Sequence, residues 1–386
     1  MGVSQDTLSR VHSQQRVHDA CGVGFVASTK AEASHQIIAL GLQAIASVQH
    51  RGGVGADGKT GDGAGIKLGL DQDFFKTEYA TISGNDAPAA PLAVGMFFLP
   101  MNDTVRREEI IKIINETIED EFGYQGTQWR DVPVNDDVLG TDARASRPHI
   151  QQLIIPPQED ETTTEFERRL YVARRVIEQR ILSKELAGKG ADTFYVPSMS
   201  THTIVYKGLS LATELGNTFP DLLDERMKST YTAFHQRFST NTTPVWERAH
   251  PYRFLAHNGE INSLQGNVNN ISVLDHLIRK AYGEEAEIIL PIIAPGGSDS
   301  ANVDNVIEAL SHAGYSLPEI KAFLVPPAFR EAKDMPANER ALYEYISAVS
   351  GPWDGPATLA MSDQQQLLLG GDRNGLRPVR YVIDDV

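Results

Sequence analysis

The sequence predicts an α+β fold, in which helices and strands come in blocks and do not alternate regularly. Apolar stretches of strand length follow one another at 193–208 and again at 358–384, and helical stretches follow one another between about 267 and 349. The chain has 386 residues, of which 41% are hydrophobic and 22% charged. Such a composition is typical of a folded globular protein with one large domain or two smaller ones.

The first half of the chain begins with residues 1–20, which are polar and aperiodic, and CGVGFVA then predicts a first strand. Apolar residues at mostly helical spacing predict a helix over 34–49. The glycines of GDGAGIKLGL weaken a helix, so this stretch predicts a turn followed by a strand. Strands are expected further on at 91–99 and 149–155, and helices at 105–122 and about 163–186.

The second half begins with TFYVPSMSTHTIVYKG, which predicts two short strands around a Pro-Ser turn. YTAFHQRF and YRFLAHNG predict two more strands. Helices are expected over 267–282, 300–312 and 338–349. TLAMS, QLLLGG and RYVID are expected to close the chain as strands.

The octapeptide GVGADGKT, residues 53–60, matches the phosphate-binding pattern G-x-x-x-x-G-K-S/T. That loop requires a strand before it and a helix after it, so that backbone N–H groups face the phosphates. Here the expected order is helix, loop, strand, so we expect no nucleotide site. An NTPase would instead bind ATP in a way that Lys59→Ala abolishes. QLLLGGD likewise indicates a hairpin strand and not a strand that ends in a magnesium-binding aspartate.

The formal net charge of −16 disfavours nonspecific binding to nucleic acid or to an anionic membrane surface. No apolar run approaches the roughly 18 residues of a spanning helix, and the N-terminal stretch has no apolar core like that of a secretory signal. We therefore expect the cytosol, or an organelle stroma or matrix in a eukaryote. Cys21 is the single cysteine, so this chain alone offers no internal disulfide and no cysteine-ligated zinc or iron–sulfur site.

Cys21 stands where the polar leader meets the first strand. If the leader were removed, the freed α-amino group, with an ordinary pKa of about 7.7–8.0, would be partly neutral at pH 7 and could accept the thiol proton. A nucleophile can use its own N-terminal amine as the base in this way. The ordinary alternative for an isolated cysteine is a small buried hydrophobic residue.

Seven motifs, in chain order, resemble the glutaminase domain of the glutamate synthase large subunit: CGVGF, HRGGVGADGKTGDGAGI, HQRFSTNT, LAHNGEIN, GGSDSANVDN, GPWDGPA and DRNGLRP. That domain is a class II glutamine amidotransferase of the N-terminal-nucleophile hydrolase superfamily. The resemblance implies a four-layer αββα fold from Cys21 to the C-terminus, with the glycine loop beside the active site. It also implies no metal or organic cofactor in this chain.

The same resemblance implies L-glutamine as substrate and a synthase domain or subunit as partner. Ammonia would pass to that partner, which forms glutamate from 2-oxoglutarate and holds FMN and an iron–sulfur cluster. By position, Cys21 is similar to the nucleophile that forms a γ-glutamyl thioester. Asn258 and Gly259 are similar to the oxyanion hole, where an amide side chain and a backbone N–H meet the developing negative charge.

Substrate-binding residues follow from the same motifs. Arg237 resembles the arginine that holds the substrate α-carboxylate, for which a planar two-pronged donor suits better than lysine. Asp299 matches the acid that pairs with the α-ammonium, and Arg51 and Thr240 resemble supporting residues. Taken singly, these residues have other readings: a surface ion pair for Arg237, a hairpin turn for Asn-Gly and a helix N-cap for Asp299.

The resemblance divides the chain into a leader or propeptide at 1–20 and an amidotransferase domain at 21–386, which either is complete or is truncated at its C-terminus. We expect the leader to be removed by cleavage between Ala20 and Cys21. Two alternatives stay open. One is a class II amidotransferase that serves another acceptor, against which GPWDGPA and DRNGLRP argue. The other is an unprocessed, inactive binding or regulatory subunit, which persistence of the leader would favour.

Overall fold

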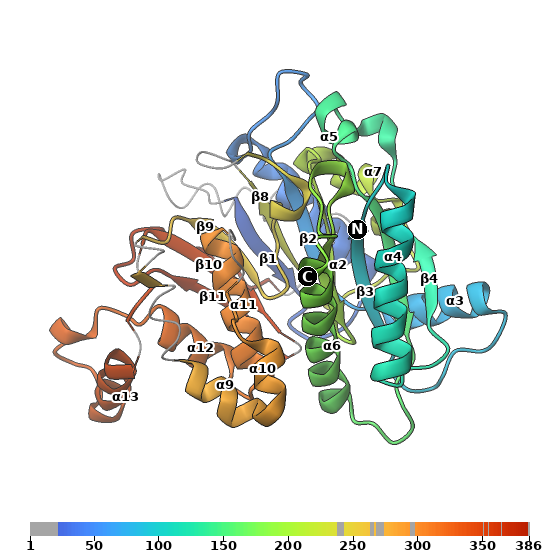
Figure 1. Cartoon of the computed structure of the whole chain (residues 1–386). Coiled ribbons are helices and arrows are strands. Elements are labelled where there is room, and N and C mark those ends of the chain that lie inside the picture. Colours follow the sequence, from blue (N-terminus) through green and yellow to red (C-terminus); the bar gives the residue numbers. More distant parts are fainter. Residues whose placement is uncertain are drawn as a thin grey trace.

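The computed structural model of the chain describes residues 22–237, 243–262, 266–267, 274–293, 298–349, 351–353, 355–363 and 365–384. It is a mixed α+β structure with antiparallel sheets (Figure 1), so the predicted fold class is confirmed. The strands are β1 Val23–Ala27, β2 Ala64–Gly69, β3 Ala93–Leu99, β4 Gln128–Asp131, β5 His149–Ile155, β6 Tyr195–Ser200, β7 Thr203–Gly208, β8 Tyr231–Gln236, β9 Leu255–Gly259, β10 Ala357–Ser362 and β11 Leu367–Gly371.

The α-helices are α2 His35–Ser47, α3 Gln72–Ser83, α4 Thr104–Asn115, α5 Thr141–Ala145, α6 Thr163–Ser183, α7 Leu215–Thr218, α9 Asp275–Tyr282, α10 Ala286–Ile289, α11 Asp299–His312, α12 Leu317–Leu324 and α13 Ala337–Val349. The strands form three sheets among the described residues, with the orders β1-β8-β2-β7, β11-β10-β9 and β4-β5-β3-β6.

The β1-β8-β2-β7 sheet is covered on both faces, because alternate residues of a strand point to opposite sides. Ile66 of β2 packs in one core cluster with Ile38 and Ile45 of α2. The next residue, Lys67, points the other way, and its buried Nζ donates to the carbonyl oxygens of Arg253 and Ser362, beside β9 and in β10. This sheet therefore lies between α2 and the three-stranded sheet.

The three-stranded sheet is covered in turn by α11. Leu255 of β9 and Leu359 of β10 share a core cluster with Val303 and Ile307 of α11. In Figure 1 this helix lies against β9 and β10, and α6 lies beside it and covers β3 together with α4. The first strand, β1, also contacts β9 and β10, although the chain separates these strands widely.

Most predicted elements are confirmed, including the strand at 149–155, whose bounds the structure reproduces, and the β10–β11 hairpin that contains QLLLGG. The Pro-Ser turn is wrong: Pro197 and Ser198 lie inside β6, and the chain reverses at residues 201–202. Proline is tolerated there because β6 is an edge strand with an irregular register against β3. Residues 380–384 form no strand. Part of the helix predicted over 267–282 lies outside the described residues.

The short helices α5, α7 and α10 were not predicted, and neither were the longer helices α3 and α12, although α3 and α12 carry start signals. Asp71 accepts hydrogen bonds from the first N–H groups of α3, and Gly84 ends that helix with a φ of +70°. Ser316 and Glu319 form a capping box at the start of α12.

The GVGADGKT loop follows α2 and a short 3₁₀ turn and precedes β2, so the predicted order of helix, loop and strand is confirmed. Its N–H groups are already used: those of Lys59 and Thr60 donate to Asp57 Oδ1, 3.0 and 2.8 Å away. The Thr60 hydroxyl donates to Asp57 Oδ2. The loop is folded around its own carboxylate and offers no cradle for a phosphate.

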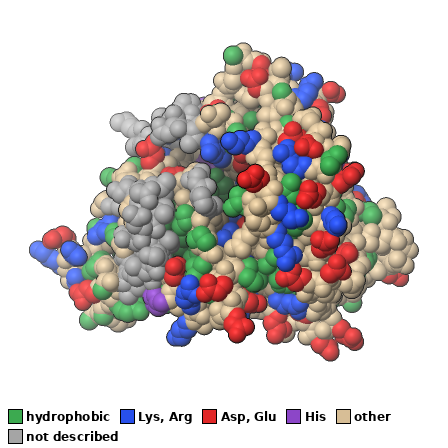
Figure 2. Space-filling model, in the orientation of Figure 1, with side chains coloured by type: hydrophobic (Ala, Val, Ile, Leu, Met, Phe, Trp, Pro, Cys, Tyr) green, Lys and Arg blue, Asp and Glu red, His purple; other side chains and the backbone are tan. Residues whose placement is uncertain are grey.

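Charged side chains of both signs lie next to one another on the face that carries α4 and α6 (Figure 2). Ion pairs join Arg180 to Glu121 and Lys184 to Glu109. The predicted long charged helix, α6, therefore exposes charged side chains of both signs on its solvent side and not a patch of one sign. No helix in the described part of the chain is long and apolar enough to cross a membrane.

Candidate active site

The start of β1 lies beside the end of β8, because the two strands are antiparallel and Val23 pairs with His235. One residue earlier, the carbonyl oxygen of Gly22 accepts a hydrogen bond of 2.6 Å from Gln236 N. A Cβ built on Gly22 would overlap the Gln236 carbonyl and lie 3.5 Å from Cβ of Arg51. The residue that follows Cys21 is thus held between the end of β8 and the turn that ends at Arg51.

Arg237 directly follows β8 and is enclosed by the glycine loop. Its N–H donates to the Gly63 carbonyl over 2.8 Å, its Nη1 donates to the Asp62 carbonyl over 3.1 Å, and its own carbonyl accepts from Gly53 N over 3.3 Å. Burial lowers the pKa of Arg237, and the nearby negative charges of Asp62 and Asp299 oppose this effect. Gly53 and Gly63 therefore hold the backbone of Arg237, and the Asp62 carbonyl holds its guanidinium. Asp299 lies within electrostatic reach of this guanidinium.

Asn258 and Gly259 are the last two residues of β9 and pair with Thr358 and Ala357 of β10. They are strand residues and not a hairpin turn. Gly259 has a φ of +150°, and a Cβ there would overlap the carbonyl of Pro356. Only glycine fits this backbone conformation and this close approach.

The strand β9 is attached along its length to α11. At its start, Asp304 Oδ1 accepts from Phe254 N and Leu255 N over 2.8 and 2.9 Å. In its middle, His257 Nδ1 is hydrogen-bonded to Ser300 Oγ over 2.9 Å. Just after its end, Ile261 N donates to Asp299 Oδ2 over 3.1 Å. Asp299, Ser300 and Asp304, all in the first two turns of α11, therefore hold β9 at three points.

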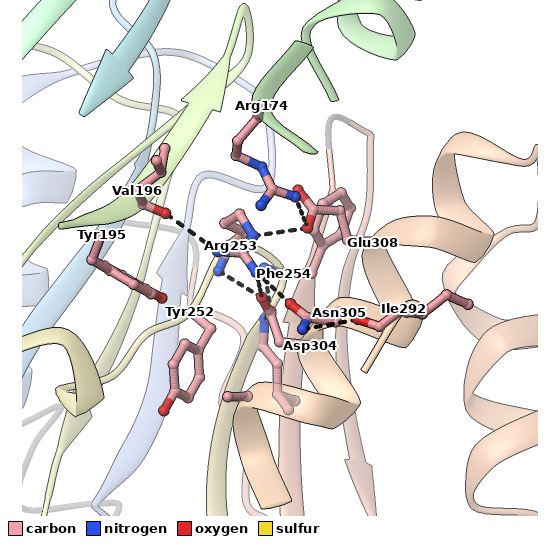
Figure 3. Close-up of polar contacts among 12 residues, drawn as sticks. Arg174, Tyr195, Val196, Tyr252, Arg253, Phe254, Ile292, Asp304, Asn305 and Glu308 are labelled. Atoms are coloured by element: carbon pink, nitrogen blue, oxygen red, sulfur yellow. Dashed lines mark hydrogen bonds and ion pairs between the residues drawn. The ribbon is translucent and has the colours of Figure 1, made fainter. Parts of the chain in front are cut away.

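Figure 3 shows the buried ionic cluster at the start of β9. Arg253 donates to Glu308 of α11 over 2.8 Å and to the Val196 carbonyl over 3.2 Å, and it pairs with Asp304. Arg174 of α6 donates to the same Glu308 over 2.6 Å. Although burial opposes ionisation of Glu308, Arg174 and Arg253 hold its pKa below the usual value. The cluster connects α6, α11 and the entry to β9.

Three buried histidines join β8 to β9. His235 Nε2 is hydrogen-bonded to the His257 carbonyl over 2.8 Å, and the rings of His235 and His250 stack with centroids 4.4 Å apart. Burial lowers the pKa of His235 to about 3 and that of His257 to about 4, and it also lowers the pKa of His250 well below the usual value. All three are neutral at pH 7 and bring the ends of the two strands together.

The structure thus brings five of the seven predicted site residues to one region: Arg51, Arg237, Asn258, Gly259 and Asp299. Cys21 and Thr240 lie outside the described residues, although Gly22 is described. Asp299 is not the N-cap of α11, since Ser298 accepts the capping hydrogen bond from Ala301 N. The Asp299 carboxylate instead accepts from Ser300 and Ile261.

With this geometry in place, comparison with known families identifies the class of protein. Residues 21–386 match the family Glutamine amidotransferases class-II, and the chain belongs to that family. Within it, the chain is 43% identical, over 98% of its length, to the glutamate synthase (NADPH) large chain of Azospirillum brasilense. It is 40% identical, over 95% of its length, to the corresponding chain of Bacillus subtilis, and 38% identical, over 95%, to ferredoxin-dependent glutamate synthase 2 of a Synechocystis species.

The chain spans about a quarter of the length of these relatives, 24%, 24% and 23% respectively. It therefore corresponds to the amidotransferase part of glutamate synthases. The predicted resemblance is confirmed.

Sequence reasoning missed the residues that hold β9 in place. Ser300 and Asp304 lie in the GGSDSANVDN motif and His257 lies in LAHNGEIN, so both motifs had been noticed. The spacing of 300, 304 and 308 also indicates one face of a helix. What no local pattern could supply was the strand against which that face packs.

Proposed function

We propose that this chain hydrolyses L-glutamine to glutamate and ammonia, with Cys21 as the nucleophile. The observation that carries the proposal is the convergence of Arg237, the Asn258–Gly259 strand end and Asp299 beside Gly22, the neighbour of Cys21. These groups come from β8, β9 and α11. They supply one cation, one carboxylate and two N–H donors. An amino acid with a reactive side-chain amide requires these groups for its α-carboxylate, its α-ammonium and the oxyanion that forms at the amide.

In the proposed reaction, the Cys21 thiolate attacks the glutamine side-chain amide and ammonia leaves, giving a γ-glutamyl thioester. Water then hydrolyses the thioester and releases glutamate. The freed α-amino group of Cys21 carries the proton between these steps. The Asn258 amide and the Gly259 N–H donate to the tetrahedral oxyanion, where one donor is typically worth about 10²–10³ in rate.

Substrate recognition is assigned to the two charged groups. Arg237 would bind the α-carboxylate with a two-pronged contact, and Asp299 would pair with the α-ammonium. Their opposite charges lie close enough to influence each other. Arg51 would support the site beside Gly22, and Thr240 would do so from the segment after Arg237.

We further propose that the ammonia passes to a synthase domain or subunit that forms glutamate from 2-oxoglutarate, because ammonium released into water is protonated and is no longer a nucleophile. The names of the relatives support this assignment. FMN and the iron–sulfur cluster would be held outside this chain, whose single cysteine cannot ligate a cluster. The compartment would be the cytosol or an organelle, and one Arabidopsis relative is named chloroplastic.

The fold proposed for this domain is the four-layer αββα arrangement of N-terminal-nucleophile hydrolases. Support comes from α2 against the β1-β8-β2-β7 sheet, from Lys67 reaching the three-stranded sheet, and from α11 on the far side of that sheet. Residues 1–20 would be a leader removed at Ala20–Cys21, and the family match begins at residue 21.

The test is intact-mass measurement of the purified chain before and after treatment with 6-diazo-5-oxo-L-norleucine, a glutamine analogue that alkylates such cysteines, together with a glutaminase assay. We expect loss of residues 1–20, one added label, and no label or glutaminase activity in Cys21→Ala with the fold retained. Substantial residual activity in Cys21→Ala would exclude Cys21 as nucleophile. A full-length, unlabelled, inactive protein would indicate the binding or regulatory alternative.

A further inference from the structure

The DRNGLRP segment forms a turn after β11 that the proposed mechanism does not use. Asp372 is only 7% exposed, and its carboxylate accepts hydrogen bonds from the backbone N–H groups of Asn374, Leu376 and Arg377 over 3.0–3.1 Å. The same carboxylate accepts from Ala357 N over 3.1 Å. Although burial opposes ionisation, these N–H donors lower the pKa of Asp372, so the turn is built on a carboxylate.

The bond to Ala357 fastens this turn to the active-site strands, because Ala357 is the residue of β10 that pairs with Gly259. Asp372 therefore fixes the turn relative to the end of β9. The guanidinium of Arg377, at the end of the turn, reaches Asn258, the residue before Gly259: Arg377 Nη1 donates to Asn258 Oδ1 over 2.6 Å.

This contact determines which way the Asn258 amide points. A guanidinium has only donors, so its partner atom must be the amide oxygen and not the NH₂ group. The terminal torsion of asparagine has two broad alternatives about half a turn apart. Without a partner, the amide could present its oxygen to the reacting group, where it would repel the developing negative charge.

We propose that Arg377 is a positioning residue for the oxyanion hole: it holds the oxygen of the Asn258 amide, so that the NH₂ group faces the substrate, and the Asp372 turn holds Arg377. The inference rests on the proposed function of Asn258. Its physical basis is that a donor fixed in advance stabilises an oxyanion without reorganisation during the reaction.

The electrostatic environment agrees with this role. Burial lowers the pKa of His257, the residue before Asn258; the negative charge of Asp299 opposes this effect, and the positive charge of Arg377 adds to it. Its field therefore reaches the end of β9. The same field favours an oxyanion over a neutral carbonyl at that place.

The experiment is a double-mutant cycle on glutamine hydrolysis with Arg377→Ala, Asn258→Ala and the pair of substitutions in the full chain. We expect Arg377→Ala to lower kcat about 10- to 100-fold, less than or equal to the loss of a whole donor, with the KM for glutamine nearly unchanged. In the Asn258→Ala background the same substitution should change kcat less than about 2-fold, because the group it positions is gone. Arg377→Lys should restore part of the rate, since lysine offers a charge but no rigid fork.

The cycle separates the possible failures. Equal losses from Arg377→Ala in both backgrounds, or a rise in KM alone, would overturn the positioning role while Asn258 keeps its own. An Asn258→Ala variant with undiminished kcat would instead overturn the oxyanion assignment in the proposed function, and this inference with it.

Thermal unfolding of each variant tests whether it is folded. The matched control is Arg380→Ala, at an exposed arginine three residues further on, which should leave kcat unchanged. If Arg377→Ala does not fold, Arg377→Lys carries the same cycle. We then expect Arg377→Lys to lower kcat several-fold in the chain that has Asn258 and to leave it unchanged in Asn258→Ala. If kcat does not fall in the chain that has Asn258, the proposal is overturned.

Discussion

At the scale of single residues, the site depends on backbone positions as much as on side chains. Gly259 combines a φ of +150° with close contact to the Pro356 carbonyl. Its neighbour Asn258 is held by Arg377. A dipeptide that would be expected in a turn is thus placed at the end of a paired strand, and the proposed function uses its N–H groups as oxyanion donors.

We predict that Gly259→Ala lowers kcat for glutamine hydrolysis at least about 100-fold, the typical effect of losing an oxyanion donor. A methyl group there must push the strand away from Pro356 and turn the N–H. The matched control is Gly84→Ala, which also has positive φ, at +70°, but lies in open space at the end of α3. That variant should lose about 1 kcal/mol of stability and keep its activity. Full activity in Gly259→Ala would argue against the oxyanion role.

At the scale of elements, α11 acts as the support for β9. Asp304 anchors the start of the strand, Ser300 its middle and Asp299 a residue two positions past its end. Glu308, one turn beyond Asp304, joins this helix to α6 through Arg174. The helix α11 therefore connects β9 to α6.

We predict that Glu308→Gln lowers the free energy of unfolding by about 3 kcal/mol, because it leaves Arg174 and Arg253 buried without one of their charged partners. Chemical denaturation would measure this change. Glu287→Gln is the control, since Glu287 pairs with Arg279 on the surface, and less than about 0.5 kcal/mol is expected. Equal effects of the two substitutions would contradict a special role for the buried cluster.

At the scale of the whole molecule, the two sheets around the site meet through neutral histidines. His235 and His257 have folded-state pKa values of about 3 and 4, and that of His250 is also strongly lowered. In the unfolded chain all three would titrate near pH 6.5. Because the unfolded state binds more protons below that pH, stability is complete above about pH 6.5 and is lost as the pH falls toward the folded-state values.

We predict a loss of about 2 kcal/mol per buried histidine between pH 7 and pH 5, measured as the change in unfolding free energy in urea. His250→Asn should make this loss of unfolding free energy smaller by the share of one histidine, about 2 kcal/mol. His276→Asn, at an exposed position, should leave it unaltered. A stability that does not vary between pH 7 and pH 5 would show that these histidines bind protons as readily in the folded protein as in the unfolded chain.

The sequence by itself determined the α+β class, most strands and helices, the order of helix, loop and strand around residues 53–60 and the family, because these follow from local periodicity, from turn chemistry and from short motifs. Five of the predicted site residues also lie in one region, and their roles stay predictions. Only the tertiary structure decided how that convergence is held: α11 along β9, the Asp372 turn against β10, and Arg377 on Asn258. These are contacts between distant segments, and a local pattern cannot specify which strand a helix face or a charged side chain will meet.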